Sequence, residues 1–324
     1  MKILLTGAAG FIGSHLCRRL IEKDHEVLGI DNFDPFYDRT LKESNLLEIR
    51  KTGRFEFHEI DIRDVESLTK MWQQRGPFDV VVHLAALAGV RPSLKAPGRY
   101  TSVNVQGTVN ILELLREKPE TRLVFASSSS VYGKRSQVPF DEEDPCNQPA
   151  SPYAATKRCG ELLSYTYNDL YGIDTVCLRF FTVYGPRQRP EMAIADFVRR
   201  VAHGEPVTLY GDGSSARDYT FIADIIDGTA AAVEKGPPGF HILNLGGSRT
   251  VSLLQLVESI ESALGVKAKK VFQPDQPGDV PITCAKVDKA GEILGYSPKI
   301  RLKEGLEEYV AWAREMKIIP KPRD

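Results

Sequence analysis

The chain has 324 residues, with 42 Lys and Arg against 43 Asp and Glu, which gives a formal net charge of -1. This length is about twice the ~150 residues of a typical domain and predicts two units or one large α/β domain. The balanced charge excludes a basic nucleic-acid binder, and 42% hydrophobic with 26% charged residues exclude a disordered, collagen-like or membrane-embedded chain.

Short apolar runs alternate with amphipathic stretches over about the first 180 residues. Helical patterns, with apolar residues three and four apart, cover Ile12–Glu22 and Val103–Arg116. Such strand–helix–strand units predict a Rossmann-type, doubly wound parallel sheet with helices on both faces. We expect its buried strands at Ile3–Thr6, Glu26–Ile30, Phe55–Ile60, Val80–Leu84, Leu123–Ala126 and Thr175–Arg179.

The regular alternation of strand-like and helical segments ends after Phe180, where the segments become shorter and prolines interrupt them. The sequence predicts a smaller, mixed α/β C-terminal domain with helices at about Met192–Ala202, Leu253–Leu264 and Leu302–Glu315. A stretch from about Tyr219 to Leu245 is expected to return to the first domain. We therefore predict a cofactor domain of residues 1–180 plus about 219–245, and a substrate domain of residues 181–218 and 246–324.

The cysteines and the N-terminus predict a cytoplasmic protein. No apolar run approaches the ~18 residues of a membrane span, and Met1–Thr6 runs directly into a glycine motif that needs it as a strand. The cysteines contain no CxxC pair and no metal-ligand spacing, so we interpret them as reduced thiols with no metal site: Cys17, Cys146, Cys159, Cys177 and Cys284.

A glycine motif between the first strand and the first helix predicts a dinucleotide site. In Gly7-Ala8-Ala9-Gly10-Phe11-Ile12-Gly13 the glycines permit a tight turn and close approach to a pyrophosphate, and the helix start offers free N–H groups. Asp31 ends the second strand, where an acid accepts the ribose hydroxyls of NAD and repels the extra phosphate of NADP. Alone, Asp31 would be a turn cap beside Asn32. With the glycines, both residues predict NAD.

Two further strand ends fit the same ligand. Asp61-Ile62 follows the third strand, where an acid can meet the adenine. Leu84-Ala85-Ala86 follows the fourth, and its small side chains let the chain pass close to the cofactor. His83, directly before them, is more typical of a hydrogen-bonded structural histidine.

A tyrosine and a lysine four residues apart predict the catalytic base. Ser151-Pro152 is typical of a helix start, and Tyr153 and Lys157 then share one helix face. A free tyrosine, with a pKa near ~10, is a poor base at neutral pH, and an adjacent ammonium lowers that value. A tyrosine–lysine pair at this spacing also occurs by chance, but here it follows the fifth strand of a dinucleotide fold.

The run Ser127-Ser128-Ser129-Ser130 ends the fifth strand and supplies the partner hydroxyl. A hydroxyl there can bond the substrate oxygen as its proton leaves. In isolation the run would be a serine-rich turn.

These motifs, followed in order by Leu178–Pro186 and Arg217-Asp218-Tyr219, resemble those of extended short-chain dehydrogenases/reductases of the nucleotide-sugar epimerase type. The resemblance covers nearly the whole chain. Within that type the sequence is most similar to UDP-glucuronate 4-epimerases. The segments that carry this similarity are Gly29–Phe33, Tyr37-Asp38, Leu41-Lys42, Ala88–Arg91 and Arg189–Ala193.

The resemblance implies NAD held tightly and a homodimer formed by the helices that carry Asn104 and Tyr153. It places the catalytic serine at Ser128, the base at Tyr153 and the lysine at Lys157. It also implies that Asn104 helps to hold the cofactor side and that Arg217 pairs with the substrate pyrophosphate.

The resemblance also bears on the reaction. Related 4,6-dehydratases carry Asp-Glu after the catalytic hydroxyl, and UDP-glucuronate decarboxylases tend to carry Glu at the second place. Here Ser129 and Ser130 stand there, and they cannot perform that proton transfer near neutral pH. We therefore expect 4-epimerisation of a UDP-sugar, UDP-glucuronate first. The alternatives are UDP-glucose or UDP-N-acetylglucosamine 4-epimerisation and, less favoured, UDP-glucuronate decarboxylation.

The remaining substrate residues are predicted from their chemistry. Ser128, Ser129, Ser130 and Thr182 can gather hydroxyls around a carboxylate. Cationic candidates are Arg91, Arg187 and Arg189, and Asp279 completes the predicted set. Gln276 stands where glucose-type epimerases usually have an arginine for the pyrophosphate, which leaves the nucleotide contacts open. A catalytically silent NAD-binding scaffold is the rival from another class, and intact Ser128, Tyr153 and Lys157 argue against it.

Overall fold

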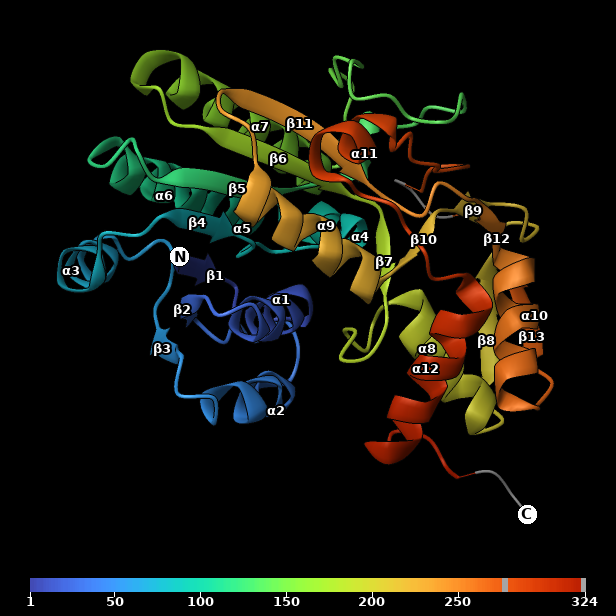
Figure 1. Cartoon of the computed structure of the whole chain (residues 1–324). Coiled ribbons are helices and arrows are strands. Elements are labelled where there is room, and N and C mark those ends of the chain that lie inside the picture. The colour runs from blue at the N-terminus through green and yellow to red at the C-terminus, as the bar shows by residue number, and fades with distance from the viewer. Residues whose placement is uncertain (276–278, 322–324) are drawn as a thin grey trace.

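A seven-stranded parallel sheet organises the larger part of the structure, which a computed structural model describes over residues 1–275 and 279–321. Its strand order is β3-β2-β1-β4-β5-β6-β11 (Figure 1). From β1 the chain builds β2 and β3 on one side, and then returns to build β4, β5 and β6 on the other side. The strand order therefore reverses between β1 and β4, which is the place where such sheets bind ligands. The strands are β1 (Lys2–Thr6), β2 (Glu26–Asp31), β3 (Phe55–Glu59), β4 (Val80–His83), β5 (Arg122–Ser128), β6 (Thr175–Phe180) and β11 (Phe240–Leu245).

Alternating side chains of these strands build one apolar core on each face of the sheet. Ile3 and Leu5 of β1 join one buried cluster, whereas Leu4 between them joins the other. Because side chains alternate along a strand, a strand buried on both faces has a continuous apolar sequence. The Rossmann-type sheet predicted from these apolar runs is confirmed.

Two layers of helices cover the sheet (Figure 1). The helices on one face are α1 (Phe11–Glu22), α2 (Arg39–Arg50) and α9 (Ile222–Lys235). The other face carries α3 (Val65–Arg75), α4 (Val90–Lys95), α5 (Pro97–Tyr100), the π-helical turn η1 (Thr101–Gln106), α6 (Gly107–Arg116) and α7 (Pro152–Tyr171). Of the helices that the structure describes, none combines the length and apolarity that crossing a bilayer requires.

The C-terminal elements form a second region beside the carboxyl ends of the sheet, on the right of Figure 1. Three short strand pairs hold it together: β7 with β10, β8 with β13, and β9 with β12. Its elements are β7 (Thr182–Tyr184), α8 (Ala193–Ala202), β8 (Pro206–Tyr210), β9 (Ala216–Arg217), β10 (Tyr219–Phe221), β12 (Val251–Ser252), α10 (Leu253–Leu264), β13 (Lys269–Gln273) and α12 (Leu302–Glu315). The C-terminal helix α11 (Asp288–Leu294) packs instead on α9 and β11 of the main sheet.

Two predicted elements differ in detail from the structure. The helix expected over Val103–Arg116 begins instead as η1 and becomes α-helical at Gly107. The strand expected over Leu123–Ala126 continues to Ser128, because Ser127 and Ser128 still pair with β6. Ser128, the predicted catalytic serine, is therefore the last residue of a strand and is followed at once by the short 3-10 helix η2 (Ser129–Tyr132).

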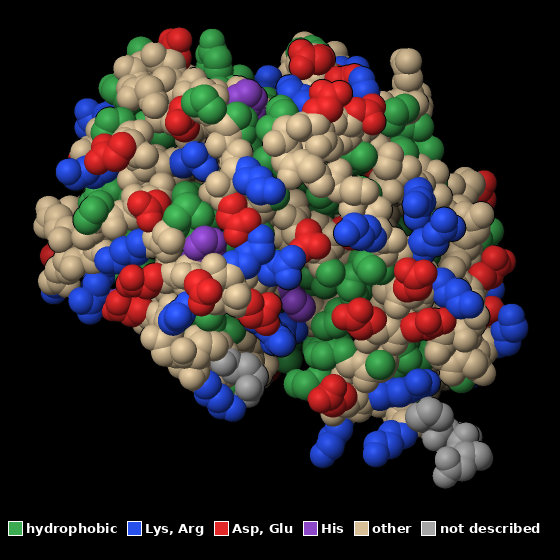
Figure 2. Space-filling model, viewed as in Figure 1, with side chains coloured by type: hydrophobic (Ala, Val, Ile, Leu, Met, Phe, Trp, Pro, Cys, Tyr) green, Lys and Arg blue, Asp and Glu red, His purple; other side chains and the backbone are tan. Residues whose placement is uncertain are grey.

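Charged side chains of both signs are interspersed over the face of the molecule shown in Figure 2. This distribution agrees with the net charge of -1. A mixed surface of this kind provides no field of a single sign over that face.

Candidate active site

A cavity of about 490 Å³ opens at the carboxyl ends of the parallel strands. Residues that follow β1, β2, β4, β5 and β6 contribute to its wall. A second cavity of about 1180 Å³ adjoins it and extends between the sheet and the C-terminal region. The two cavities share Thr182, Arg189 and Arg217 in their walls, so they form one cleft.

The glycine motif shapes the inner end of this cleft. Gly7 has φ +74°, and a Cβ on it would lie 2.9 Å from the Ala85 nitrogen, so only glycine fits. A Cβ on Gly13 would lie 2.1 Å from the Gly7 carbonyl oxygen, which explains how closely α1 packs on the loop. Gly10 is the N-cap of α1 and provides no side-chain cap. The first-turn N–H groups therefore face the cavity wall that Phe11 and Ile12 line.

Asp31 lies at the end of β2 as predicted and lines the cavity. Its carboxylate accepts hydrogen bonds from the Phe33 nitrogen at 2.8 Å and the Ala9 nitrogen at 3.2 Å. Burial raises the pKa of Asp31, whereas the nearby Lys42 ammonium lowers it. An acid held by backbone donors at this place has the geometry to accept ribose hydroxyls.

Asn32 and Asp61 are bonded to each other across the same end of the cavity. The Asn32 side-chain amide donates to Asp61 at 2.8 Å, and Arg63 donates to both oxygens of that carboxylate. Hydrogen bonds from Arg63 hold the pKa of Asp61 at about 2, so it is a carboxylate at neutral pH. Ile62 lies beside it in the cavity wall.

The segment after β4 passes along the cavity floor. Leu84, Ala85 and Ala86 all line the cavity, as the small side chains predicted. Asn104 lies behind this wall: its side chain accepts from the Leu87 nitrogen at 2.8 Å and donates to the Leu87 oxygen at 2.9 Å. It therefore braces the segment from behind.

His83, at the end of β4, is a structural histidine. Its ring nitrogens bond Thr6 at 2.7 Å and Thr108 at 3.1 Å. Burial and the charge of Lys157 lower its pKa to about 3, so the imidazole is neutral.

Tyr153 projects from the first turn of α7 into the cavity wall. The Ser151 hydroxyl caps this helix by accepting from the Ala154 nitrogen, and Pro152 occupies the first turn, as predicted. Burial raises the pKa of Tyr153, while hydrogen bonding to the Ser128 side chain and the charge of Arg189 lower it. The predicted base and the predicted catalytic serine are thus brought together.

Lys157 lies one turn further along α7 and is buried. Its Nζ donates to the Ala126 carbonyl at 2.7 Å and lies 5.2 Å from the centre of the Phe125 ring. In this structure Arg189 is the cation whose charge lowers the pKa of Tyr153, against the effect of burial. Burial lowers the pKa of Lys157 itself to about 8, although the charge of Glu161, one turn further along α7, acts to raise it.

The serine run forms a shelf of hydroxyls opposite Tyr153. The Ser128 and Ser130 hydroxyl oxygens lie 2.6 Å apart, and Ser128 also accepts from the Ser130 nitrogen. Ser128, Ser129 and Ser130 all line the cavity. The shelf can donate and accept hydrogen bonds, but it carries no carboxylic acid.

A buried ion pair that the sequence analysis missed lies beneath this shelf. Glu161 of α7 binds Arg179 of β6 through two hydrogen bonds of 2.8 and 3.0 Å, with both side chains 0% exposed. The Ser127 hydroxyl donates to Glu161 at 2.5 Å, and Arg179 lies over the ring of Tyr132. The only sequence signal was an arginine inside a predicted buried strand.

Cations gather where the two cavities meet. Arg91 binds Asp279 at 2.8 Å and lies over the ring of Tyr210. Arg189 lies 5.3 Å from the centre of the Phe36 ring. Arg217 lies on β9, and burial lowers its pKa. The predicted substrate residues, which lie up to 188 positions apart in sequence, are thus collected in one cleft.

One predicted contact, Arg187, is not part of this cluster. Arg187 lines neither cavity, and its charge acts on His15 of α1, whose pKa burial lowers to about 4. Its backbone is left-handed, with φ +65°, within the tight turn that follows β7. Gln276 lies outside the described residues.

We call the cavity of about 490 Å³ the inner cavity and that of about 1180 Å³ the outer cavity. The chemistry of the inner cavity fits NAD. Helix α1 offers uncapped N–H groups to a pyrophosphate, and Asp31 offers acceptors to a ribose. Tyr153 and Ser128 lie at the outer end, where a reacting sugar would meet the nicotinamide. The sequence analysis did not assign a site role to Lys42, Phe36 or Tyr210, which line these cavities.

Comparisons with known proteins agree with this geometry. The model of the NAD dependent epimerase/dehydratase family matches residues 3–246. The UDP-glucuronate 4-epimerase of Thermodesulfobacterium geofontis is 43% identical over 313 residues, which cover 96% of either chain.

Two solved structures are similar over almost the whole chain. A UDP-glucuronic acid 4-epimerase from Bacillus cereus, in complex with UDP-glucuronic acid and NAD, matches with a TM-score of 0.91 and 39% identity, covering 98% of this chain and 100% of that one. A UDP-glucose 4-epimerase from Thermotoga maritima, with UDP-glucose, matches with a TM-score of 0.90 and 32% identity at the same coverage. On these findings and the geometry of its cofactor site, the chain belongs to the NAD dependent epimerase/dehydratase family.

Proposed function

We propose that this protein is an NAD-dependent 4-epimerase that interconverts UDP-glucuronate and UDP-galacturonate. The observation that carries the proposal is the pairing of Tyr153 with a shelf of serine hydroxyls at Ser128–Ser130, in place of the acids that dehydration requires. A base without a second acid supports removal and return of hydrogen at one carbon. The similarity to UDP-glucuronate 4-epimerases supports the uronic acid as the sugar.

The chain's own groups would handle the proton of the sugar 4-hydroxyl. Tyr153 takes that proton, and the Ser128 hydroxyl bonds the same oxygen as its charge changes. NAD, when bound in the inner cavity, would supply the acceptor for the hydride of carbon 4 and the donor that returns it. Between these two transfers the 4-keto sugar rotates, so that carbon 4 receives the hydride on its other face. Tyr153 then gives the proton back to the oxygen of the inverted centre.

We assign the cofactor to the inner cavity. Gly7, Gly10 and Gly13 let the pyrophosphate approach the start of α1, and Asp31 receives the adenosine ribose. Lys157 is the donor for the nicotinamide ribose. The other residues proposed for this site are Phe11, Ile12, Asn32, Asp61, Ile62, Leu84, Ala85, Ala86 and, from behind the wall, Asn104.

We assign the sugar nucleotide to the outer cavity. Arg217 and Arg189 are the cations for the pyrophosphate, and Arg91 reaches it when its ion pair with Asp279 opens. The sugar reaches from there into the inner cavity, where Thr182, which lines both cavities, and the serine shelf receive the carboxylate. A 4-keto uronic acid readily loses carbon dioxide, so hydroxyls that hold the carboxylate out of line with the carbonyl would suppress that loss.

Cofactor binding and substrate binding are thus assigned to two different parts of the chain. Residues 1–180 and about 219–245 are the proposed cofactor domain, and residues 181–218 and 246–324 are the proposed substrate domain. The position of β11 beside β6 in the main sheet supports the return of the chain to the first domain.

We also propose a homodimer in the cytoplasm. Exposed apolar side chains on α7, at Leu162, Tyr165 and Leu170, support an interface on that helix. Five free cysteines, at Cys17, Cys146, Cys159, Cys177 and Cys284, are typical of a reducing compartment.

The test is to incubate the purified protein separately with UDP-glucuronate, UDP-glucose and UDP-N-acetylglucosamine, and to identify the products by NMR. We expect inversion at carbon 4 of UDP-glucuronate, and Tyr153→Phe should abolish it. Inversion confined to the two neutral sugars would assign the protein to the glucose-type epimerases. NAD binding without any reaction would instead support the catalytically silent NAD-binding scaffold.

A further inference from the structure

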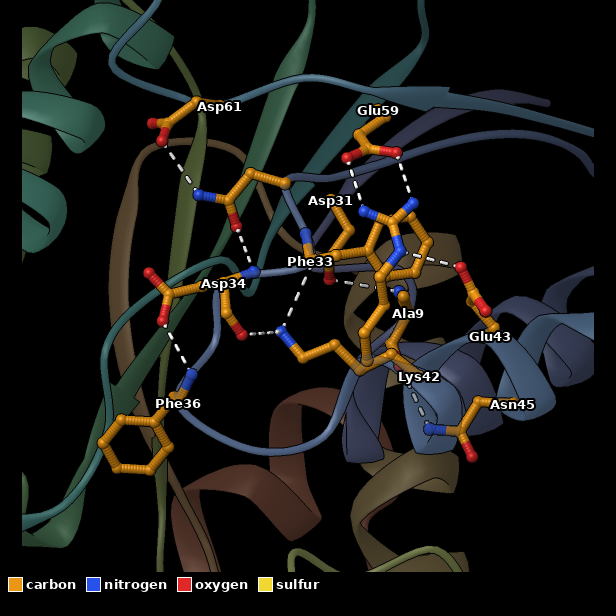
Figure 3. Close-up of polar contacts among 12 residues, drawn as sticks. Ala9, Asp31, Phe33, Asp34, Phe36, Lys42, Glu43, Asn45, Glu59 and Asp61 are labelled. Atoms are coloured by element: carbon orange, nitrogen blue, oxygen red, sulfur yellow. Dashed lines mark hydrogen bonds and ion pairs between the residues drawn. The ribbon is translucent and has the colours of Figure 1, made fainter.

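A lysine and an aspartate, both buried, face each other at the ribose end of the cofactor cavity (Figure 3). The Lys42 ammonium of α2 lies 3.7 Å from Asp31 Oδ1 at the end of β2, with side chains only 7% and 8% exposed. Both residues line the cavity. Because lysine is rarely buried without a partner, this ion pair is a built feature of the site.

Lys42 is fixed in place by two further contacts. Its ammonium donates to the Asp34 carbonyl oxygen at 3.1 Å and lies 4.9 Å from the centre of the Tyr37 ring. Asn45 lies on the same face of α2, one turn along, and donates to the Ala9 oxygen at 3.0 Å. The buried face of α2 therefore holds both the glycine loop and the ribose acid.

Asp31 retains acceptor capacity in this arrangement. One oxygen accepts the Phe33 nitrogen and the other accepts the Ala9 nitrogen, and each carboxylate oxygen has two lone pairs. Two ribose hydroxyls can therefore still bond to it. The ammonium lies 3.7 Å from the oxygen that accepts the Phe33 N–H, and Lys42 also lines the cavity.

The other charged side chains near Asp31 form ion pairs with residues other than Lys42. Glu59, its register partner on β3, is bound by Arg39 on the outside of the sheet. Asp61 is bound by Arg63. Tyr37 packs against the pair as a neutral phenol, since burial and Asp31 raise its pKa. Lys42 is thus the cation that counters the effect of burial on Asp31.

We propose that Lys42 determines cofactor specificity together with Asp31: its ammonium keeps the acid ionised to receive the ribose of NAD, and it becomes a site for the 2′-phosphate of NADP once the charge of Asp31 is removed. The inference rests on NAD binding in this cavity. Selectivity then belongs to the pair, because the carboxylate both repels the phosphate and neutralises the cation that would attract it.

The test is calorimetric binding of NAD and NADP to the full chain, for the parent, Lys42→Met, Asp31→Asn and the double variant. At about pH 5.5, Lys42→Met should bind NAD about tenfold more weakly than at about pH 7, because burial raises the pKa of Asp31 and the cation that lowers it is gone. The parent should change by less than about threefold between these values. Lys42→Arg should restore the behaviour of the parent.

NADP binding tests the second half of the proposal. Asp31→Asn should bind NADP at least about tenfold more tightly than the parent, and adding Lys42→Met should remove that gain. Lys70→Met removes an exposed lysine from α3 and is the matched control, with no expected change. If Lys42→Met alone does not fold, the double variant, in which both charges are removed together, can still be compared with Asp31→Asn for its NADP affinity.

Equal NADP affinity of Asp31→Asn with and without Lys42 would overturn the inference, as would parental pH dependence in folded Lys42→Met. Failure of the parent to bind NAD would instead overturn the proposed function. The two failures are therefore distinguishable.

Discussion

Replacement of Arg179 by methionine tests the buried ion pair beneath the serine shelf. The change keeps an unbranched apolar stem but removes the cation from Glu161, which retains the hydrogen bonds of Ser127 at 2.5 Å and Arg158 at 2.9 Å. Both members of the pair are 0% exposed. Glu161 would therefore keep its position with one cation instead of two.

The expected cost follows from that burial. Removing one partner of a buried ion pair costs about 3–5 kcal/mol, and the remaining bond from Arg158 favours the lower end, about 3 kcal/mol. Burial tends to raise the pKa of Glu161, but Arg179 outweighs it and holds the pKa below its usual value. Without Arg179 the folded-state pKa rises above the unfolded one. Stability of the variant then falls as pH increases, so its deficit is greater at about pH 8 than at about pH 5.

Urea unfolding of the parent, Arg179→Met, Glu161→Leu and the double variant measures this coupling. NAD is left out throughout, since a ligand that binds only the folded state adds stability. The double variant should recover at least about 1.5 kcal/mol of the summed single losses, because an apolar pair can replace a buried ion pair at little cost. A deficit below about 1 kcal/mol for Arg179→Met, or equal deficits at both pH values, would refute this reasoning.

Three further predictions concern the site directly. Gly13→Ala places a Cβ 2.1 Å from the Gly7 oxygen and should lower NAD affinity by at least about tenfold in calorimetry, whereas Gly98→Ala, with open space around its Cβ, should leave it unchanged. NAD affinity should fall as pH rises through about 8, where Lys157 loses its charge, and this dependence should vanish in Lys157→Met. Thr182→Ala should raise the yield of a decarboxylated, xylose-type product from UDP-glucuronate. No increase over the parent, measured by NMR, would contradict the proposed hydroxyl network.

The sequence predicted what depends on local pattern. Apolar runs flanked by amphipathic stretches identified the strands, and the sequence correctly predicted the capped helix that carries Tyr153 and Lys157. What it could not predict depends on contacts between distant segments. Arg91 meets Asp279 across 188 positions, and nothing local shows that Lys42 turns inward to Asp31. Arg187 was expected beside the substrate, but the left-handed turn at that residue places it outside the cavity walls.

The position of each ion pair in the cleft suggests which pairs open during turnover. Arg91 and Asp279 are 46% and 37% exposed, and a pair so exposed contributes only about 0–1 kcal/mol. A pyrophosphate can therefore displace Asp279 from Arg91 at little cost. Arg179 and Glu161 are fully buried, and opening that pair would leave an uncompensated charge beneath Ser127. Charges at the mouth can thus exchange partners with an anionic substrate while the pair beneath Ser127 stays fixed, although the net charge of the chain is only -1.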